Sequence, residues 1–152
     1  MSDDYYFNNS RYQQTPTLPI EYLQDGYFEN DSEKDGKKLK REFILDYAKD
    51  LSEKFAFKNK MKKYNLRKFY NYCIQLKVKM NARGGKIEYI LEDIAKLVPL
   101  SFQAVNKSPS IAPQIFAEFF EKNVNAIKTE DDFKAFLKHF EAIVAYFEKS
   151  KS

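Results

Sequence analysis

The stretch TEDDFKAFLKHFEAIVAYFEK, residues 129–149, has the clearest helical pattern of the chain. Its apolar residues recur at spacings of three and four, so they share one face of a helix. They are Phe133, Phe136, Leu137, Phe140, Ile143, Val144 and Phe147. Thr129 can cap the first free amide groups, and Glu130, Asp131 and Asp132 lie at the positive end of the helix dipole. The stretch therefore predicts a long C-terminal helix with one buried face.

The same period occurs twice in the first half of the chain. Residues 39–57 predict a helix whose apolar stripe contains Phe43, Ile44, Tyr47, Leu51 and Phe55. A basic link, KNKMKK, follows, and residues 64–83 predict a second helix that Gly84 and Gly85 end. The apolar face of this second helix contains Leu66, Phe69, Tyr70, Cys73, Leu76 and Met80, and the opposite face contains Lys68, Tyr72, Gln75 and Lys79.

A third stripe runs from Ile87 to Val98, and Pro99 should kink or end this helix before Phe102 and Val105 resume the pattern. The segment SPSIAP makes a break, and a fourth helix follows with Pro113 in its first turn. No alternating pattern of a strand competes. The fold class is therefore all-α, a single five-helix bundle over residues 39–150.

Residues 1–38 lack a helical period and contain Pro16, Pro19, Gly26 and Gly36. This composition predicts an irregular or partly disordered N-terminal arm. Its aromatic residues can dock on a neighbour, or the arm can be flexible and unattached. These residues are Tyr5, Tyr6, Phe7, Tyr12, Tyr22, Tyr27 and Phe28.

Bulk composition narrows the class of protein. A chain of 152 residues has the length of one domain, and 43% apolar residues are enough for a core. A single cysteine rules out an internal disulfide. The N-terminus does not have the pattern of a secretory signal, and no apolar stretch has the length of a membrane span. The expected location is the cytoplasm, without contact with a membrane.

Charge is strongly segregated along the chain. Residues 1–36 contain eight acidic and two basic groups, residues 37–86 contain four and sixteen, and residues 87–152 contain ten and eight. These counts give net charges of −6, +12 and −2, which sum to +4. Residues 54–86 contain eleven Lys or Arg and no Asp or Glu. A positive field of this kind attracts polyanions, although an ordinary solvated lysine-rich face is the alternative.

The basic window mixes cations with aromatic and amide residues. Cations neutralise phosphates, and aromatic rings such as those of Phe57, Tyr64, Tyr70 and Tyr72 can stack on bases. This combination favours RNA or another single strand, bound without sequence specificity. The candidate contacts are Lys58, Lys60, Lys62, Lys63, Arg67 and Lys68 around the link, and Lys79, Arg83 and Lys86 at the far end of the second helix.

The inventory of reactive groups is poor for an enzyme. Cys73 and His139 are the only residues of their kinds, and a cysteine on an apolar stripe is typical of a buried thiol. His139, on the flank of the last helix, is expected at the surface or half-buried. Two such residues cannot form a four-ligand zinc site, and no phosphate-binding glycine motif is present. We therefore expect no catalytic activity, no metal and no cofactor.

Three segments resemble a known family. YNLRKF (residues 64–69), LVPLSFQAVNK (97–107) and DDFKAFLKHFEAIVAYFEK (131–149) resemble sequences of the small helical subunit of type III-A CRISPR effector complexes, the Csm small subunit. The resemblance covers roughly residues 39–149, and EAIVAYF is its most specific piece. Asn65, Tyr64 and the pair Asn106 and Lys107 depart from the family pattern.

The resemblance implies a non-catalytic subunit that stacks in several copies inside a ribonucleoprotein and helps to hold guide RNA and target RNA. From the same resemblance, Arg67 and Lys107 are expected to contact RNA. Other subunits of the complex, and further copies of this chain, are the implied protein partners. Two alternatives stay open: a helical adaptor whose basic face binds an acidic protein, and the analogous small subunit of a type III-B complex.

Overall fold

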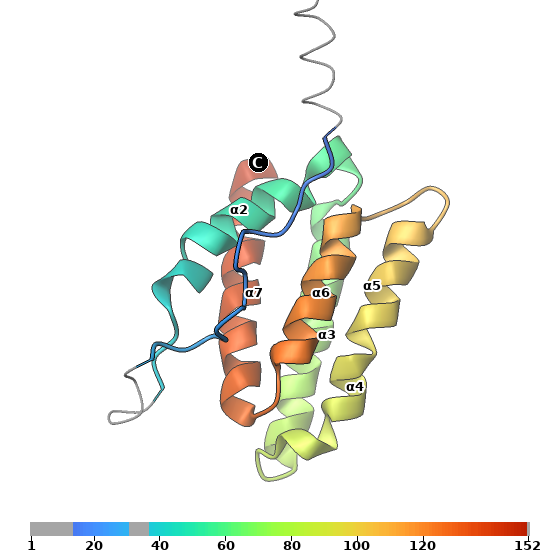
Figure 1. Ribbon diagram of the computed structural model, residues 1–152. Coiled ribbons are helices and arrows are strands. Elements are labelled where there is room, and N and C mark those ends of the chain that lie inside the picture. Colours follow the sequence, from blue (N-terminus) through green and yellow to red (C-terminus); the bar gives the residue numbers. More distant parts are fainter. Residues whose placement is uncertain (1–13, 31–36, 152) are drawn as a thin grey trace, which may run out of the picture.

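Six α-helices account for most of the described chain in the computed structural model, which describes residues 14–30 and 37–151. They are α2 (Asp46–Phe55), α3 (Lys63–Ala82), α4 (Leu91–Ala95), α5 (Leu97–Asn106), α6 (Gln114–Ala126) and α7 (Glu130–Lys151), as Figure 1 shows. Within the described ranges the extended pairing is limited to an isolated bridge between Phe28 and Leu39. The predicted all-α bundle is confirmed. In the same ranges, no helix has both the length and the apolar content that a membrane crossing requires.

The core lies between α7 and the helices that surround it. Both α2 and α3 pack on α7, and α5 packs on α6. Phenylalanine rings fill the centre: Phe119 lies 5.1 Å from Phe120 and 5.7 Å from Phe140, measured between ring centroids. All three side chains are fully buried. Aromatic pairs at these separations stabilise a core beyond the area they bury.

The start of α7 forms the predicted cap. The Asp132 amide donates to Thr129 Oγ1 at 3.1 Å, and the Thr129 amide donates to Asp132 Oδ2 at 3.1 Å, so each residue satisfies the other. Glu130 accepts from the Ile87 amide at 2.8 Å, and this hydrogen bond lowers the pKa of its carboxyl group. The N-terminus of α7 is thereby joined to the segment that follows α3.

The second predicted helix ends at Gly84 and Gly85 as expected, whereas the third is interrupted at a different residue from Pro99. Gly84 and Gly85 have φ values of 79° and 74°, and the Gly85 amide donates to the Met80 carbonyl just beyond α3. The third predicted helix is divided at Lys96 into α4 and α5, three residues ahead of Pro99. Pro99 lies in the first turn of α5, where its missing N–H is not needed. The predicted break is therefore present, but earlier than expected.

The first predicted helix is shorter than its apolar stripe. A 3-10 turn (Arg41–Phe43) comes first, and α2 begins only at Asp46. Leu45 has φ −105° and ψ −92°, which lies outside the helical region, so the two pieces cannot join. Phe43 is buried within the 3-10 turn, and thus the stripe continues across the break.

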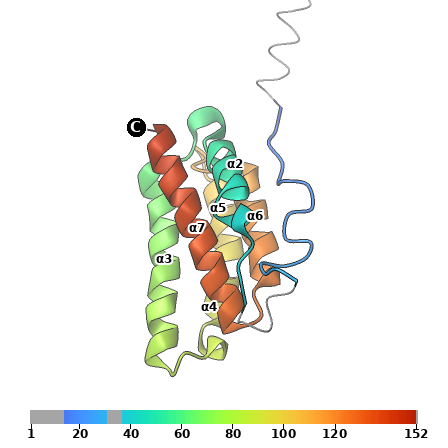
Figure 2. The ribbon, with the colours of Figure 1, turned by 90° about the vertical axis from the view of Figure 1, so that its left-hand side faces the viewer.

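The described part of the N-terminal arm, residues 14–30, lies against the bundle. Tyr22, Leu23 and Tyr27 are buried in the same core as the helices. Lys54 Nζ on α2 donates to the Thr17 carbonyl at 2.7 Å. Figures 1 and 2 show the arm on the opposite side of the bundle from α3. The predictions for Tyr5, Tyr6, Phe7 and Tyr12 lie outside the described residues, and the division at residue 38 stays a prediction.

Candidate nucleic-acid interface

The link between α2 and α3 is basic outside and anchored by one apolar side chain. Met61 is fully buried, whereas Lys58, Lys62 and Lys63 are exposed and Lys60 is half-buried. The Asn65 side chain accepts from the Lys62 amide at 2.9 Å, which caps the start of α3. Met61 and the Asn65 cap thus hold these lysines close to the first turn of α3. Sequence analysis missed Met61, because a single apolar residue has no period.

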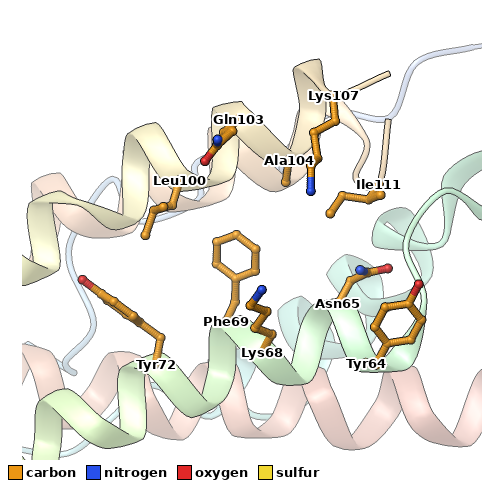
Figure 3. A pocket seen from close by; sticks show the side chains of 10 residues that line it. All are labelled: Tyr64, Asn65, Lys68, Phe69, Tyr72, Leu100, Gln103, Ala104, Lys107 and Ile111. Atoms are coloured by element: carbon orange, nitrogen blue, oxygen red, sulfur yellow. The ribbon is translucent and has the colours of Figure 1, made fainter. Parts of the chain in front are cut away.

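A groove of about 440 Å³ separates α3 from α5 (Figure 3). Side chains from both helices and from the segment after α5 line it: Tyr64, Asn65, Lys68, Phe69, Tyr72, Leu100, Gln103, Ala104, Lys107 and Ile111. Ala104 is too small to fill the space between the two helices. The groove therefore has apolar and aromatic walls, two amide side chains and two lysines.

Lys68 and Lys107 reach into this groove from opposite sides, as Figure 3 shows. Both residues are exposed, and neither forms an ion pair within the described part of the chain. Among the described residues, no Asp or Glu lines the groove. Two cations facing one cavity without a carboxylate create a positive potential that favours an anion between them. The fold thus brings together two predicted contacts that are distant in sequence.

The three predicted cations at the far end of α3 are in a different situation. Lys79 Nζ lies 2.8 Å from Asp93 Oδ2, and Lys96 Nζ lies 3.6 Å from the other oxygen of that carboxylate. The hydrogen bond from Lys79 lowers the pKa of Asp93. Arg83 lies over the Tyr89 ring, 5.5 Å from its centroid, and Lys86 is exposed. Lys79, Arg83 and Lys86 are not among the described residues that line the groove, whose α3 wall runs from Tyr64 to Tyr72.

Most aromatic residues of the basic window are already engaged. The Tyr72 hydroxyl donates to the Asp93 carbonyl at 3.0 Å, and Tyr70 donates to Glu141 at 3.2 Å while its ring packs on Phe140. Lys58 lies over the Phe57 ring. Tyr72 shares the groove side of α3 with Lys68, and its bond to Asp93 leaves it half-buried there. Tyr64 is 71% exposed and lies at the groove.

Cys73 and His139 are both buried. Burial raises the pKa of the Cys73 thiol well above its usual range. The prediction that His139 is exposed or half-buried was wrong, because the hydroxyl of Tyr22 and the carbonyl of Phe43 each lie 2.6 Å from one of its ring nitrogens. Both nitrogens are thus occupied, and neither is left for Cys73. In the described ranges no three His, Cys, Asp or Glu residues come together as a metal site.

Arg67 lies on the exposed side of the first turns of α3. Burial and Glu141 raise the pKa of Tyr70, and Arg67 opposes this rise to a smaller extent. Lys63, Arg67 and Lys68 all belong to the first turns of α3, and Figure 2 shows α3 on the side of the bundle opposite the described part of the arm.

Comparison with known proteins gives one match. Residues 37–152 match the family described as Csm2 Type III-A. Neither the curated proteins nor the solved structures contain a match to this chain. The matched range is more than half of the chain and includes all the described helices, the groove and the basic link. The chain therefore belongs to the Csm2 family, the structural and generally non-catalytic small subunit of type III-A CRISPR effector complexes.

Proposed function

We propose that this small subunit holds guide RNA and target RNA by their phosphates, through the link before α3 and the groove between α3 and α5. Several copies would stack along the complex in antiviral defence. The observation that carries the proposal is the convergence of Lys68 and Lys107 on one groove whose described lining contains no acidic side chain. Lysines arranged in this way neutralise phosphates and do not read the identity of bases.

The lysines of the link extend the same surface. Lys62, Lys63 and Arg67 are exposed around the first turns of α3, next to Lys68. A strand that passes from the link into the groove would meet cations over the whole path. The far-end residues contribute less to this proposal, since Lys79 is neutralised by Asp93 and Arg83 is engaged with Tyr89. Lys58 and Lys60 lie in the link before α3, and Lys86 lies just after the C-terminal end of α3.

Fluorescence anisotropy with a labelled single-stranded RNA tests this proposal. If about four phosphates are neutralised, the plot of log affinity against log salt has a slope of about −3. Reversal of Lys60, Lys63 and Arg67 to Glu should abolish binding, whereas reversal of Lys122, Lys134 and Lys138 on α6 and α7 makes the same charge change elsewhere. Equal loss in the two variants would show that only net charge matters, and would contradict the site.

A second candidate is a protein-interaction role for the same basic face, with an acidic partner. The net charge of −6 on residues 1–36 favours it, because the acidic arm of one copy can meet the basic face of another. Light scattering separates the candidates. Under this second role the Lys60, Lys63 and Arg67 reversal would lower the mass of the assembly without changing RNA affinity.

A further inference from the structure

The groove between α3 and α5 has more apolar and aromatic wall than phosphate binding needs. We propose that it accepts a single unstacked nucleobase of the bound RNA, while Lys68 and Lys107 hold the phosphates on either side of that nucleotide. This inference rests on the proposed function and adds a pocket for a base to a surface for phosphates. Its volume of about 440 Å³ lies within the range of small-molecule sites.

The two aromatic walls of the groove are rigid. The Phe69 ring is in edge-to-face contact with Phe116 at 4.9 Å and lies 5.5 Å from Phe120, both of which are fully buried. The Tyr72 hydroxyl is bonded to the Asp93 carbonyl, which fixes the ring against α4. A base that enters the groove therefore meets surfaces whose conformational entropy has already been lost.

Apolar surface at the groove is exposed in the chain by itself. Leu100 is 38% exposed, and Tyr64 at the rim is 71% exposed. Burying these surfaces against a flat heteroaromatic ring removes them from water, and stacking on an aromatic side chain adds to this gain. An isolated phosphate would leave the same surfaces in water.

Amide groups give the groove polar contacts that suit a base edge. The side-chain oxygen of Asn65 accepts from the Lys62 amide, so its Nδ2 amide hydrogens are the donors that can meet an acceptor on a ligand. Gln103 on the α5 side is exposed and offers both a donor and an acceptor. Nucleobases present both kinds of groups at their edges. Lys68 and Lys107 attract phosphates, so the groove should bind a nucleotide more tightly than an uncharged ligand of the same shape.

The test uses two oligomers with the same ribose-phosphate backbone and length. One is wholly abasic, and the other has a single central adenine. The parent chain should bind the single-base oligomer more tightly than the abasic one by roughly 5- to 150-fold, the range expected for one stacked base. Ala104→Leu fills the groove without changing any charge, so it should remove this difference between the two oligomers.

Leu100→Ala provides a second variant that does not depend on how well the core accepts a larger side chain. It removes an exposed wall of the groove and should reduce the preference for the base at an unchanged melting temperature. Persistence of the full base preference in both variants would overturn the inference. A smaller assembly mass for Ala104→Leu with unchanged base preference would mean that a protein neighbour fills the groove, and would also overturn it. Absence of salt-sensitive binding to either oligomer would refute the proposed function itself.

Discussion

His139 Nε2 on α7 lies 2.6 Å from the hydroxyl oxygen of Tyr22 in the arm. The other ring nitrogen, Nδ1, faces the Phe43 carbonyl, which can only accept, so Nδ1 carries the proton and Nε2 accepts from Tyr22. The Tyr22 hydroxyl accepts in turn from Asn123, and Asn123 accepts from Tyr27. One directed chain of hydrogen bonds thus joins the arm to α6, α7 and the 3-10 turn.

Stability should fall as the pH is lowered through the range of histidine. Burial lowers the pKa of His139 from 6.5 to about 4 in the folded protein. The unfolded chain therefore takes up a proton below pH 6.5 that the folded chain takes up only near pH 4. The stabilisation is complete above pH 6.5, is lost progressively down to pH 4, and amounts to roughly 3 kcal/mol.

Urea unfolding at pH 7.0 and pH 5.5 measures this loss before most carboxylates titrate. His139→Gln is the matched variant, since it keeps a polar side chain but cannot gain a proton. The parent should lose stability between the two pH values and the variant should not. An equal loss in both would assign the effect to other groups.

Removal of one hydroxyl should weaken the attachment of the arm. Tyr22→Phe leaves His139 Nε2 and one amide hydrogen of Asn123 without a partner in the core, which costs about 1–3 kcal/mol. Tyr47→Phe removes a hydroxyl from a half-buried ring that packs on Tyr22 without joining the network, and should cost under about 0.5 kcal/mol. Denaturant unfolding of the two variants, compared with the parent, should separate them; equal stability would refute the network.

Two lysines on α3 should differ in their contribution to RNA binding. Lys68 faces the groove without an ion pair in the described ranges, whereas Lys79 is paired with Asp93. Lys68→Ala should reduce the salt slope of binding by about 0.7, the value for one phosphate of a single strand. Lys79→Ala should leave the slope unchanged. If the effects are reversed, the strand follows the far end of α3.

Cys73 should react only when the bundle opens. Its thiol is fully buried, and burial raises the pKa, so little thiolate is accessible at neutral pH. Labelling with a thiol reagent at pH 8 should be fast in denaturant and slower by orders of magnitude in the native protein. Native labelling at the rate of a free cysteine would mean that Cys73 is accessible and would reopen a catalytic reading.

Local signals were sufficient to predict the helices. The stripe from Phe133 to Phe147, the cap at Thr129 and the stop at Gly84 and Gly85 each depend on neighbours in sequence, and each is present. The break near Pro99 was expected at the wrong residue. A proline excludes the helical bond of the preceding turn, and so it can begin a helix as well as end one.

Contacts between distant residues could not be predicted in the same way. The burial of His139 depends on Tyr22, which is 117 residues away, and no period links the two. Lys107 was expected only from family resemblance, and its position across the groove from Lys68 depends on how α5 packs on α6. Charge segregation predicted a candidate site within residues 54–86, but the groove itself is a tertiary feature.

The RNA affinity of the double variant Lys68→Glu and Lys107→Glu is the most direct test of an interface that spans α3 and α5. It should be measured by anisotropy at several salt concentrations beside Lys122→Glu and Lys138→Glu, which make the same change in net charge. Loss of two phosphate contacts predicts at least roughly 25-fold weaker binding at 0.1 M salt and a slope smaller by about 1.4. Equal affinities for the two double variants would contradict the interface.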